Sequence, residues 1–317
     1  MSKAAKVGAS IVVTAILVWL LLQHIDAHSV LNAVRGANLA WAAIAFLLYT
    51  ICYLFRTVRF QVLLQHKLTL KELFSITALH NLFTNLLPFR SGEFSYPYML
   101  RRKVGLGESL TTLVLARMFD FMAVAMAFLI TMAFLPALPS LIIGTIWTIS
   151  IFLVVLIALS LLALFASAAL IEFFQRLIPK SLRQHRAGKW VGKKLREIAL
   201  ATKSLRGRAL VNVGSYSLGI WIFQFLTYAA LLHSVGLNMS FISVVVTVSL
   251  VSLASAIPIQ GLAGIGTTEA YWSAVLIALG AEKSTAIAAA FAQHFYVITF
   301  YLALGAVGYA LSFYRKR

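Results

Sequence analysis

Long runs of apolar residues recur along the chain and predict most of its elements. They cover residues 7–23, 40–64, 110–135, 141–170, 209–233 and 284–312. A helix needs about 20 apolar residues to cross the hydrocarbon core of a bilayer, so each run predicts a membrane-spanning helix. The first run follows two lysines, as in a signal peptide, but no small-residue cleavage motif comes after it. We therefore expect this segment to be retained as the first helix.

Two further apolar regions, residues 69–100 and 241–280, are interrupted near their middles. The first break has the sequence LPFRSGE over residues 87–93, and the second has PIQGLAGIG over residues 258–266. Proline lacks an amide hydrogen and glycine permits unusual backbone angles, so helices end at such places. Irregular backbone is tolerated at membrane depth only where it is buried in protein or lines a wet cavity. Each region therefore predicts a broken or re-entrant helical hairpin.

The predicted fold class is an all-α polytopic membrane protein with about six full spanning helices and two broken or re-entrant helical hairpins. An N-terminal membrane half, residues 1–171, holds the hairpin 69–100. A basic linker, residues 172–208, joins it to a C-terminal membrane half, residues 209–317, which holds the second hairpin.

A faint internal repeat relates these two halves. Glu93 follows the first break and Glu269 follows the second, and the positions 24 residues further on are Arg117 and Gln293. Many transporters are built from inverted repeats whose broken helices meet near the middle of the membrane. The repeat favours such an inverted arrangement here.

Composition agrees with a membrane protein and excludes several other classes. Of the 317 residues, 61% are hydrophobic and 11% are charged, whereas soluble domains are nearer half apolar and a quarter charged. A disordered chain, a fibrous protein and a soluble enzyme are thereby excluded. The single cysteine, Cys52, and the lack of any Cys/His cluster argue against zinc, iron–sulfur and thiol redox chemistry. We expect no cofactor.

The net charge of +18 is concentrated in one segment. The linker 172–208 holds eleven Lys and Arg residues against two acidic residues, a net charge of +9 and half of the total. Cytoplasmic loops carry an excess of basic residues, so the linker, the first lysines and the basic tail 315–317 predict cytoplasmic N- and C-termini. Threading the helices from that constraint makes the two broken hairpins enter the membrane from opposite sides.

The linker has two interpretations that the sequence leaves open. It sets topology alone, or its basic residues also contact anionic lipid at the membrane surface. Candidate surface contacts are Lys189, Lys193, Lys194 and Arg196. Nucleic acid is not an expected partner, because no nucleic-acid-binding fold is available.

A few charged residues lie within or beside the apolar runs and are the candidate functional residues. A charge at a helix centre costs about 2.5–3.5 kcal/mol on insertion scales, so each needs a partner or water. They are Arg90, Glu93, Arg117, Asp120 and Glu269. They serve either as internal structural pairs, as dipole-favoured charges at helix N-termini, or as a headgroup-binding site.

Other polar residues in the apolar regions allow similar alternatives. Arg56 and Arg59 share a helix face, and they either need an internal partner or water, as the other charges in apolar surroundings do, or extend to the cytoplasmic surface. Asn81 and Asn85, four residues apart, either bond neighbouring helices or line a polar path. His80 and His294 are each isolated in sequence and are expected to be satisfied core histidines. The serines at 249, 252 and 255, like the two asparagines, either bond between helices or line a polar path.

The sequence around the first break resembles a known family. Residues 87–121, LPFRSGEFSYPYMLRRKVGLGESLTTLVLARMFDF, resemble the signature of the lysylphosphatidylglycerol synthetase transmembrane-region family of flippase-like proteins. The matching residues are Asn85, Pro88, Arg90, Gly92, Glu93, Arg117 and Asp120, and in the second motif Pro258, Gly261, Gly264, Gly266 and Glu269. The resemblance covers about residues 10–312. Departures are Ala116 before the arginine, a looser glycine segment, and Gln293-His294 where an arginine is common.

The resemblance implies a membrane protein that moves or handles lipids. Bifunctional members are associated with flipping lysylphosphatidylglycerol made by a separate soluble domain, and other relatives with hopanoid, glycolipid or polyprenyl-phosphate pathways. The chain ends directly after its last predicted helix, so we expect no soluble aminoacyl-transfer domain and no enzyme activity. We expect a flippase-like lipid transporter in a bacterial or archaeal cytoplasmic (inner) membrane.

The expected ligand is the anionic or zwitterionic headgroup of a phospholipid or glycolipid, and a homo-oligomer is left open. The predicted substrate-binding residues are Arg90, Glu93, Arg117, Asp120, Glu269, Asn81, Asn85, Gly264 and Gly266. Two alternatives remain at this stage: a non-transporting accessory protein of envelope lipid synthesis, and an intramembrane lipid-modifying enzyme that uses Glu93 or His80 as a base.

Overall fold

The described part of the chain is built of helices, and no strand occurs in it. The computed structural model describes residues 19–21, 23, 27–134, 140–165, 207–256 and 262–313. Its elements are α2 (Ala27–Arg35), α3 (Leu39–Leu63), α4 (Leu70–Leu86), η1 (Pro88–Phe94), α5 (Ser95–Leu100), α6 (Leu106–Met132), α7 (Ser140–Phe165), α11 (Arg208–Ser234), α12 (Phe241–Ala254), η2 (Leu262–Gly264), α13 (Thr267–Ala278) and α14 (Lys283–Phe313). The helices α3, α6, α7, α11 and α14 occupy the predicted apolar runs.

Within the described residues, four helices are long and apolar enough to cross a membrane. They are α3, α6, α11 and α14. Large apolar side chains such as Leu47, Ile130 and Val211 are exposed on them, as expected of surfaces that face lipid. The protein is therefore a membrane-spanning, all-helical protein. The predicted span 7–23, apart from residues 19–21 and 23, and the basic linker except its last two residues lie outside the described residues.

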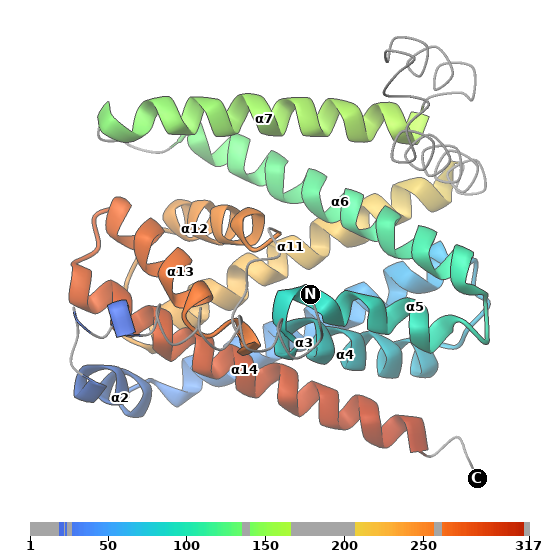
Figure 1. Ribbon diagram of the computed structural model, residues 1–317, viewed down its shortest axis with the longest axis horizontal. Coiled ribbons are helices and arrows are strands. Elements are labelled where there is room, and N and C mark those ends of the chain that lie inside the picture. Colours follow the sequence, from blue (N-terminus) through green and yellow to red (C-terminus); the bar gives the residue numbers. More distant parts are fainter. Residues whose placement is uncertain are drawn as a thin grey trace.

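The helices pack in pairs that bring the two halves of the sequence together. Helix α3 packs along α11, α4 along α14, and α6 against α12, while α7 lies at one edge against α6 (Figure 1). Small residues allow close approach where α4 meets α14. Gly308 faces Ala78, and its carbonyl oxygen accepts a hydrogen bond of 2.6 Å from Ser75. The short helix α2, which the sequence pattern did not predict, also packs on α14.

The first break forms where it was predicted. Helix α4 begins with a capping box, in which Thr69 and Glu72 satisfy each other's backbone amides, and ends at Leu86, just before Pro88. The next turn, η1, holds Phe89 and Arg90 at φ of +53° and +52°, in the left-handed region that non-glycine residues rarely adopt. The chain then returns along α4 as α5.

The second break is confirmed over its described part. Helix α12 begins at the Ser240 cap, and the chain is described again from η2, where Ala263 has a φ of +53°. Helix α13 then begins with the Glu269 carboxylate accepting the Gly266 amide at 2.7 Å. The turns η1 and η2 are in contact with each other, so the two breaks meet inside the helical assembly.

Candidate functional site

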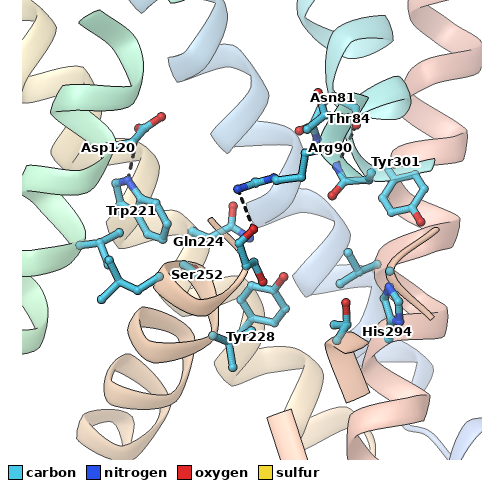
Figure 2. A pocket seen from close by; sticks show the side chains of 18 of the residues that line it. Asn81, Thr84, Arg90, Asp120, Trp221, Gln224, Tyr228, Ser252, His294 and Tyr301 are labelled. Atoms are coloured by element: carbon cyan, nitrogen blue, oxygen red, sulfur yellow. Dashed lines mark hydrogen bonds between the residues drawn. The ribbon is translucent and has the colours of Figure 1, made fainter. Parts of the chain in front are cut away.

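A polar cavity of about 200 Å³ lies where the two breaks meet. Its walls come from α3, α4, α6, α11, α12, α13 and α14 together with η1 and η2, and Figure 2 shows side chains from several of these elements pointing into it. The residues that line it include Tyr49, Arg56, Asn81, Thr84, Asn85, Arg90, Arg117, Asp120, Trp221, Gln224, Tyr228, Ser252, Gly264, His294 and Tyr301. Six of the nine predicted site residues line the cavity: Asn81, Asn85, Arg90, Arg117, Asp120 and Gly264.

The other three predicted residues, Glu93, Glu269 and Gly266, do not line the cavity. Glu93 binds Arg117, and Glu269 binds His294, and both of these partners do line it. Gly266 in turn donates its amide to Glu269. These residues therefore position the cavity wall from behind it.

One wall of the cavity is fixed by a buried ion pair between α3 and α6. Arg59 donates from Nη1 to Asp120 Oδ1 at 2.6 Å and from Nη2 to Oδ2 at 3.2 Å. Arg59 also donates to Ser217 at 3.0 Å, and Trp221 donates to Asp120 at 3.3 Å. Arg59 is 2% exposed, so of the two interpretations the internal partner is confirmed and extension to the membrane surface is wrong. A bidentate carboxylate satisfies its guanidinium within the protein instead.

Arg117 holds the first break against α6. Its Nη2 lies 2.6 Å from Glu93 Oε1, while its Nη1 lies 3.7 Å from Asp120 Oδ2. The local pair of Arg117 with Asp120, which their three-residue spacing favoured, is thus the weaker of the two contacts. Arg117 bridges two carboxylates that belong to different elements.

Arg90 connects the first half of the protein to the second. Its Nη1 donates to the backbone carbonyl oxygen of Ser255 at 2.9 Å, just after α12 ends, and Figure 2 shows the side chain extending across the cavity. Its Nη2 is 4.0 Å from Glu93 Oε1, which Arg117 already binds more closely. The residue that bridges the two halves is therefore also one whose backbone is in the left-handed region.

The second half of the protein contains a buried pair of Glu269 with His294, where the first half has the pair of Glu93 with Arg117. Glu269 Oε1 lies 2.7 Å from His294 Nδ1, and Glu269 is 2% exposed. Gln293 stands 24 residues after Glu269, as Arg117 does after Glu93, but its side chain donates to the carbonyl oxygen of Ala290. His294 is a buried histidine with a hydrogen-bond partner, as predicted, and it also lines the cavity.

Arg56 lies in the cavity, where the sequence had left open whether it extends to the membrane surface. Its Nη1 donates to Asn81 Oδ1 and its Nη2 to Gln224 Oε1, both at 3.4 Å. Asn81 donates in turn to Tyr49 at 3.2 Å and to the Tyr53 hydroxyl. Arg56 lines the cavity rather than extending to the membrane surface. The one signal for this position was its spacing from Arg59 on the same face of an apolar helix.

Several neutral polar and aromatic residues of the cavity carried no sequence signal. Gln224, Tyr228, Trp221 and Tyr301 lie on apolar runs, where an isolated polar residue or aromatic ring has no characteristic spacing. For Ser252 the sequence left open a bond between helices or a polar path, and the residue lines the cavity. These residues are identified as cavity residues by their positions around one cavity, which the pattern along a single helix does not show.

A comparison with protein families identifies the chain. The model of the lysylphosphatidylglycerol synthase TM region matches residues 7–314. The chain belongs to this family. The match covers every helix described above and the whole cavity, and it confirms the resemblance drawn from the two motifs. Comparisons with curated proteins and with solved structures give no match.

Proposed function

We propose that this member of the lysylphosphatidylglycerol synthase TM region family translocates a phospholipid or other amphipathic lipid between the two leaflets of its membrane. The observation that carries the proposal is the polar, arginine-containing cavity enclosed by apolar spanning helices. Placing polar groups in hydrocarbon costs free energy, so the polar groups that line an internal cavity need a polar ligand or water as a partner.

The cavity lowers the barrier that a headgroup meets in the bilayer. A charged headgroup that enters hydrocarbon loses its hydration, and hydrogen-bond donors on Arg56, Arg90 and Arg117 replace part of it. The contact of η1 with η2 supports a passage formed between the two halves. The pairing of α4 with α14 and of α12 with α6 supports the inverted repeat, because the two pairs exchange under that symmetry.

The same proposal includes the orientation of the chain. The basic linker and both termini lie in the cytoplasm, and the membrane is the cytoplasmic membrane. Residues Lys189, Lys193, Lys194 and Arg196 contact anionic lipid headgroups there. The two broken segments then reach the cavity from opposite sides of the bilayer.

Binding, and not catalysis, suits the arrangement best. His80 lies 3.0 Å from Ser95 and 3.8 Å from Glu93, a spacing that invites a catalytic interpretation. None of these three side chains lines the central cavity, and Glu93 is bound more closely by Arg117. A catalytic group must reach the reacting atoms, so we propose that the protein changes the sidedness of a lipid and not its structure.

Reconstitution with fluorescent lipids tests the proposal. Purified protein in liposomes is expected to expose inner-leaflet lipid to a membrane-impermeant quencher faster than protein-free liposomes do. Ser252→Trp fills the cavity and is expected to return the rate to the protein-free value. Val211→Trp, on the exposed face of α11, is the matched control and should behave as the original protein.

Two outcomes would contradict the proposal. Translocation no faster than in protein-free liposomes, across several headgroups and with a pH gradient, would favour an accessory protein. A change in the mass of the lipid would identify an enzyme.

A further inference from the structure

On one side of the cavity, the positive charges of the arginines outnumber the negative charges of the carboxylates. Four arginines and two carboxylates gather where α3, α4, α6 and η1 meet: Arg56, Arg59, Arg90, Arg117, Glu93 and Asp120. Their formal sum is +2. Glu269, which lies behind the part of the wall that His294 lines, is 2.7 Å from His294 Nδ1 and accepts the Gly266 amide. On the side of the cavity formed by α3, α4, α6 and η1, two positive charges therefore lack a carboxylate.

The contacts identify which two arginines carry the excess. Arg59 is held by both oxygens of Asp120, and Arg117 is held by Glu93 at 2.6 Å. Among the residues that the structure describes, Arg56 has only the neutral amide oxygens of Asn81 and Gln224, each at 3.4 Å. These are long contacts for a charge-assisted hydrogen bond, which is normally nearer 2.7–2.9 Å.

Arg90 is satisfied only in part. Its single hydrogen bond goes to a backbone carbonyl oxygen, and the nearest carboxylate oxygen lies 4.0 Å away. Within the part of the chain that the structure describes, the Nε atoms of both Arg56 and Arg90 are buried without a hydrogen-bond partner. Buried donors are almost always paired in folded proteins, so these atoms indicate a ligand with acceptor oxygens.

The remaining lining supplies neutral donors to the same space. The Tyr301 hydroxyl is buried without a partner, and the residue lines the cavity at 1% exposure. Ser252 contributes a hydroxyl from α12 on another side, as Figure 2 shows. Guanidinium groups and hydroxyls around one cavity are the donors that phosphate oxygens accept well.

We propose that the cavity is a site for a phosphate-bearing lipid headgroup of net negative charge, with Arg56 as its main anchor and Arg90 as the second. A phosphomonoester, or a phosphodiester without an amine, supplies the missing anion. A zwitterionic headgroup supplies it less well, and an aminoacylated headgroup of net positive charge is disfavoured because its amine meets the uncompensated arginines. The ligand's lipid nature rests on the function proposed above, whereas the charge preference rests on the cavity alone.

Binding to the purified full-length chain in detergent tests this preference by native mass spectrometry. The probes are phosphatidic acid, phosphatidylglycerol, phosphatidylethanolamine and lysylphosphatidylglycerol with matched acyl chains. The two anionic lipids are expected to bind at least about tenfold more tightly than the other two, given the strength of hydrogen bonds between charged groups. Equal or tighter binding of lysylphosphatidylglycerol or phosphatidylethanolamine would overturn the assignment.

Soluble inorganic phosphate distinguishes a lipid headgroup from a free anion. The acyl chains add apolar contacts outside the cavity, so inorganic phosphate is expected to displace phosphatidic acid only weakly. Displacement at concentrations similar to that of the lipid would identify free phosphate as the ligand and would overturn the lipid part of the proposal.

Two substitutions test the anchor itself. Arg56→Gln is expected to lower the affinity for phosphatidic acid at least about tenfold. Gln224→Glu is nearly isosteric and places a carboxylate beside Arg56, so the protein is expected to fold and to melt no lower than the original while losing the lipid. The second variant separates loss of the site from loss of the fold, and unchanged phosphatidic acid binding in folded Gln224→Glu protein would overturn the proposal.

Arg102→Gln is the matched control. Arg102 is exposed in the turn after α5, and its replacement changes the overall charge as Arg56→Gln does without altering the cavity. Its affinity for phosphatidic acid should equal that of the original protein. If Arg102→Gln and Arg56→Gln weaken binding equally, the preference belongs to general surface charge, and the assignment to the cavity is overturned.

The two proposals fail separately. Selective binding of anionic lipid without accelerated translocation would contradict the proposed function and leave this site intact. Accelerated translocation without any headgroup preference would contradict the charge assignment and leave the proposed function intact.

Discussion

Replacing Gly92 with alanine is expected to disrupt the first break and with it the cavity. A Cβ atom on Gly92 would overlap the backbone carbonyl group of Phe83 and the backbone nitrogen of Thr84, both on α4. Backbone within a helix cannot move aside as a flexible side chain does, so η1 must leave α4. Overpacking of this kind costs about 1–3 kcal/mol and occasionally more, and we expect Gly92→Ala to reach or exceed the upper figure.

Thermal unfolding in detergent, followed by size-exclusion chromatography, measures this effect. Gly107→Ala is the matched control, because a Cβ at that helical position meets nothing within 4 Å. It should be neutral or stabilising by up to about 1 kcal/mol. A melting temperature for Gly92→Ala equal to that of the original protein would show that η1 is not seated on α4 as described.

The substitution Asp120→Asn is expected to have a comparable effect on stability. It leaves the guanidinium of Arg59 buried at 2% exposure with only neutral acceptors nearby. Removing one partner of a buried ion pair typically costs about 3–5 kcal/mol, because the other charge is left unpaired. Arg117 loses a contact as well, at 3.7 Å. The expected result is a marked fall in the melting temperature and in the yield of monodisperse protein.

The double substitution Arg59→Met with Asp120→Leu separates this cause from others. Replacing both members of a buried pair with apolar residues of similar volume is often neutral, so the double variant should recover most of the lost stability. Equal instability of the single and double variants would contradict a major role for the unpaired charge. Because Asp120 also lines the cavity, recovery of stability need not restore translocation.

The helices were predictable because hydrophobicity along one segment determines whether it spans a membrane. The run 40–64 became α3 at Leu39–Leu63, and the run 209–233 became α11 at Arg208–Ser234. The first break was likewise predictable, since Pro88 and Gly92 act through local backbone geometry. The helix α2 was missed because its sequence, AHSVLNAVR, is short and only partly apolar.

The partners of the buried charges were not predictable from spacing. The pattern showed that Arg117 and Asp120 share a helix face, but the closest partner of Asp120 is Arg59, 61 residues away. Such a pair depends on how α3 and α6 pack, which a linear pattern does not contain. The same limit explains Arg56, whose role depends on residues from α4 and α11.

The two glutamates that the internal repeat relates bind residues at slightly different distances along the chain. Counting 24 residues from Glu93 reaches Arg117, its partner in the structure. The partner of Glu269 is His294, 25 residues on. A shift of one residue along a helix rotates a side chain by about 100°, so only the structure could assign the contact to His294 and not to Gln293.

Photocrosslinking in a bilayer tests most directly whether lipid headgroups enter the cavity. Two phosphatidylglycerol analogues are used with the original protein, one with a photoreactive group in the headgroup and one with it at the end of an acyl chain. Peptide mapping is expected to place headgroup adducts on cavity-lining positions of α11 and α12, near Gln224 and Ser252, with marked loss in Ser252→Trp. Chain adducts should fall on outward-facing positions near the middle of the spanning helices, such as Ile222. Headgroup adducts confined to the ends of the helices, with none on cavity residues, would contradict the account.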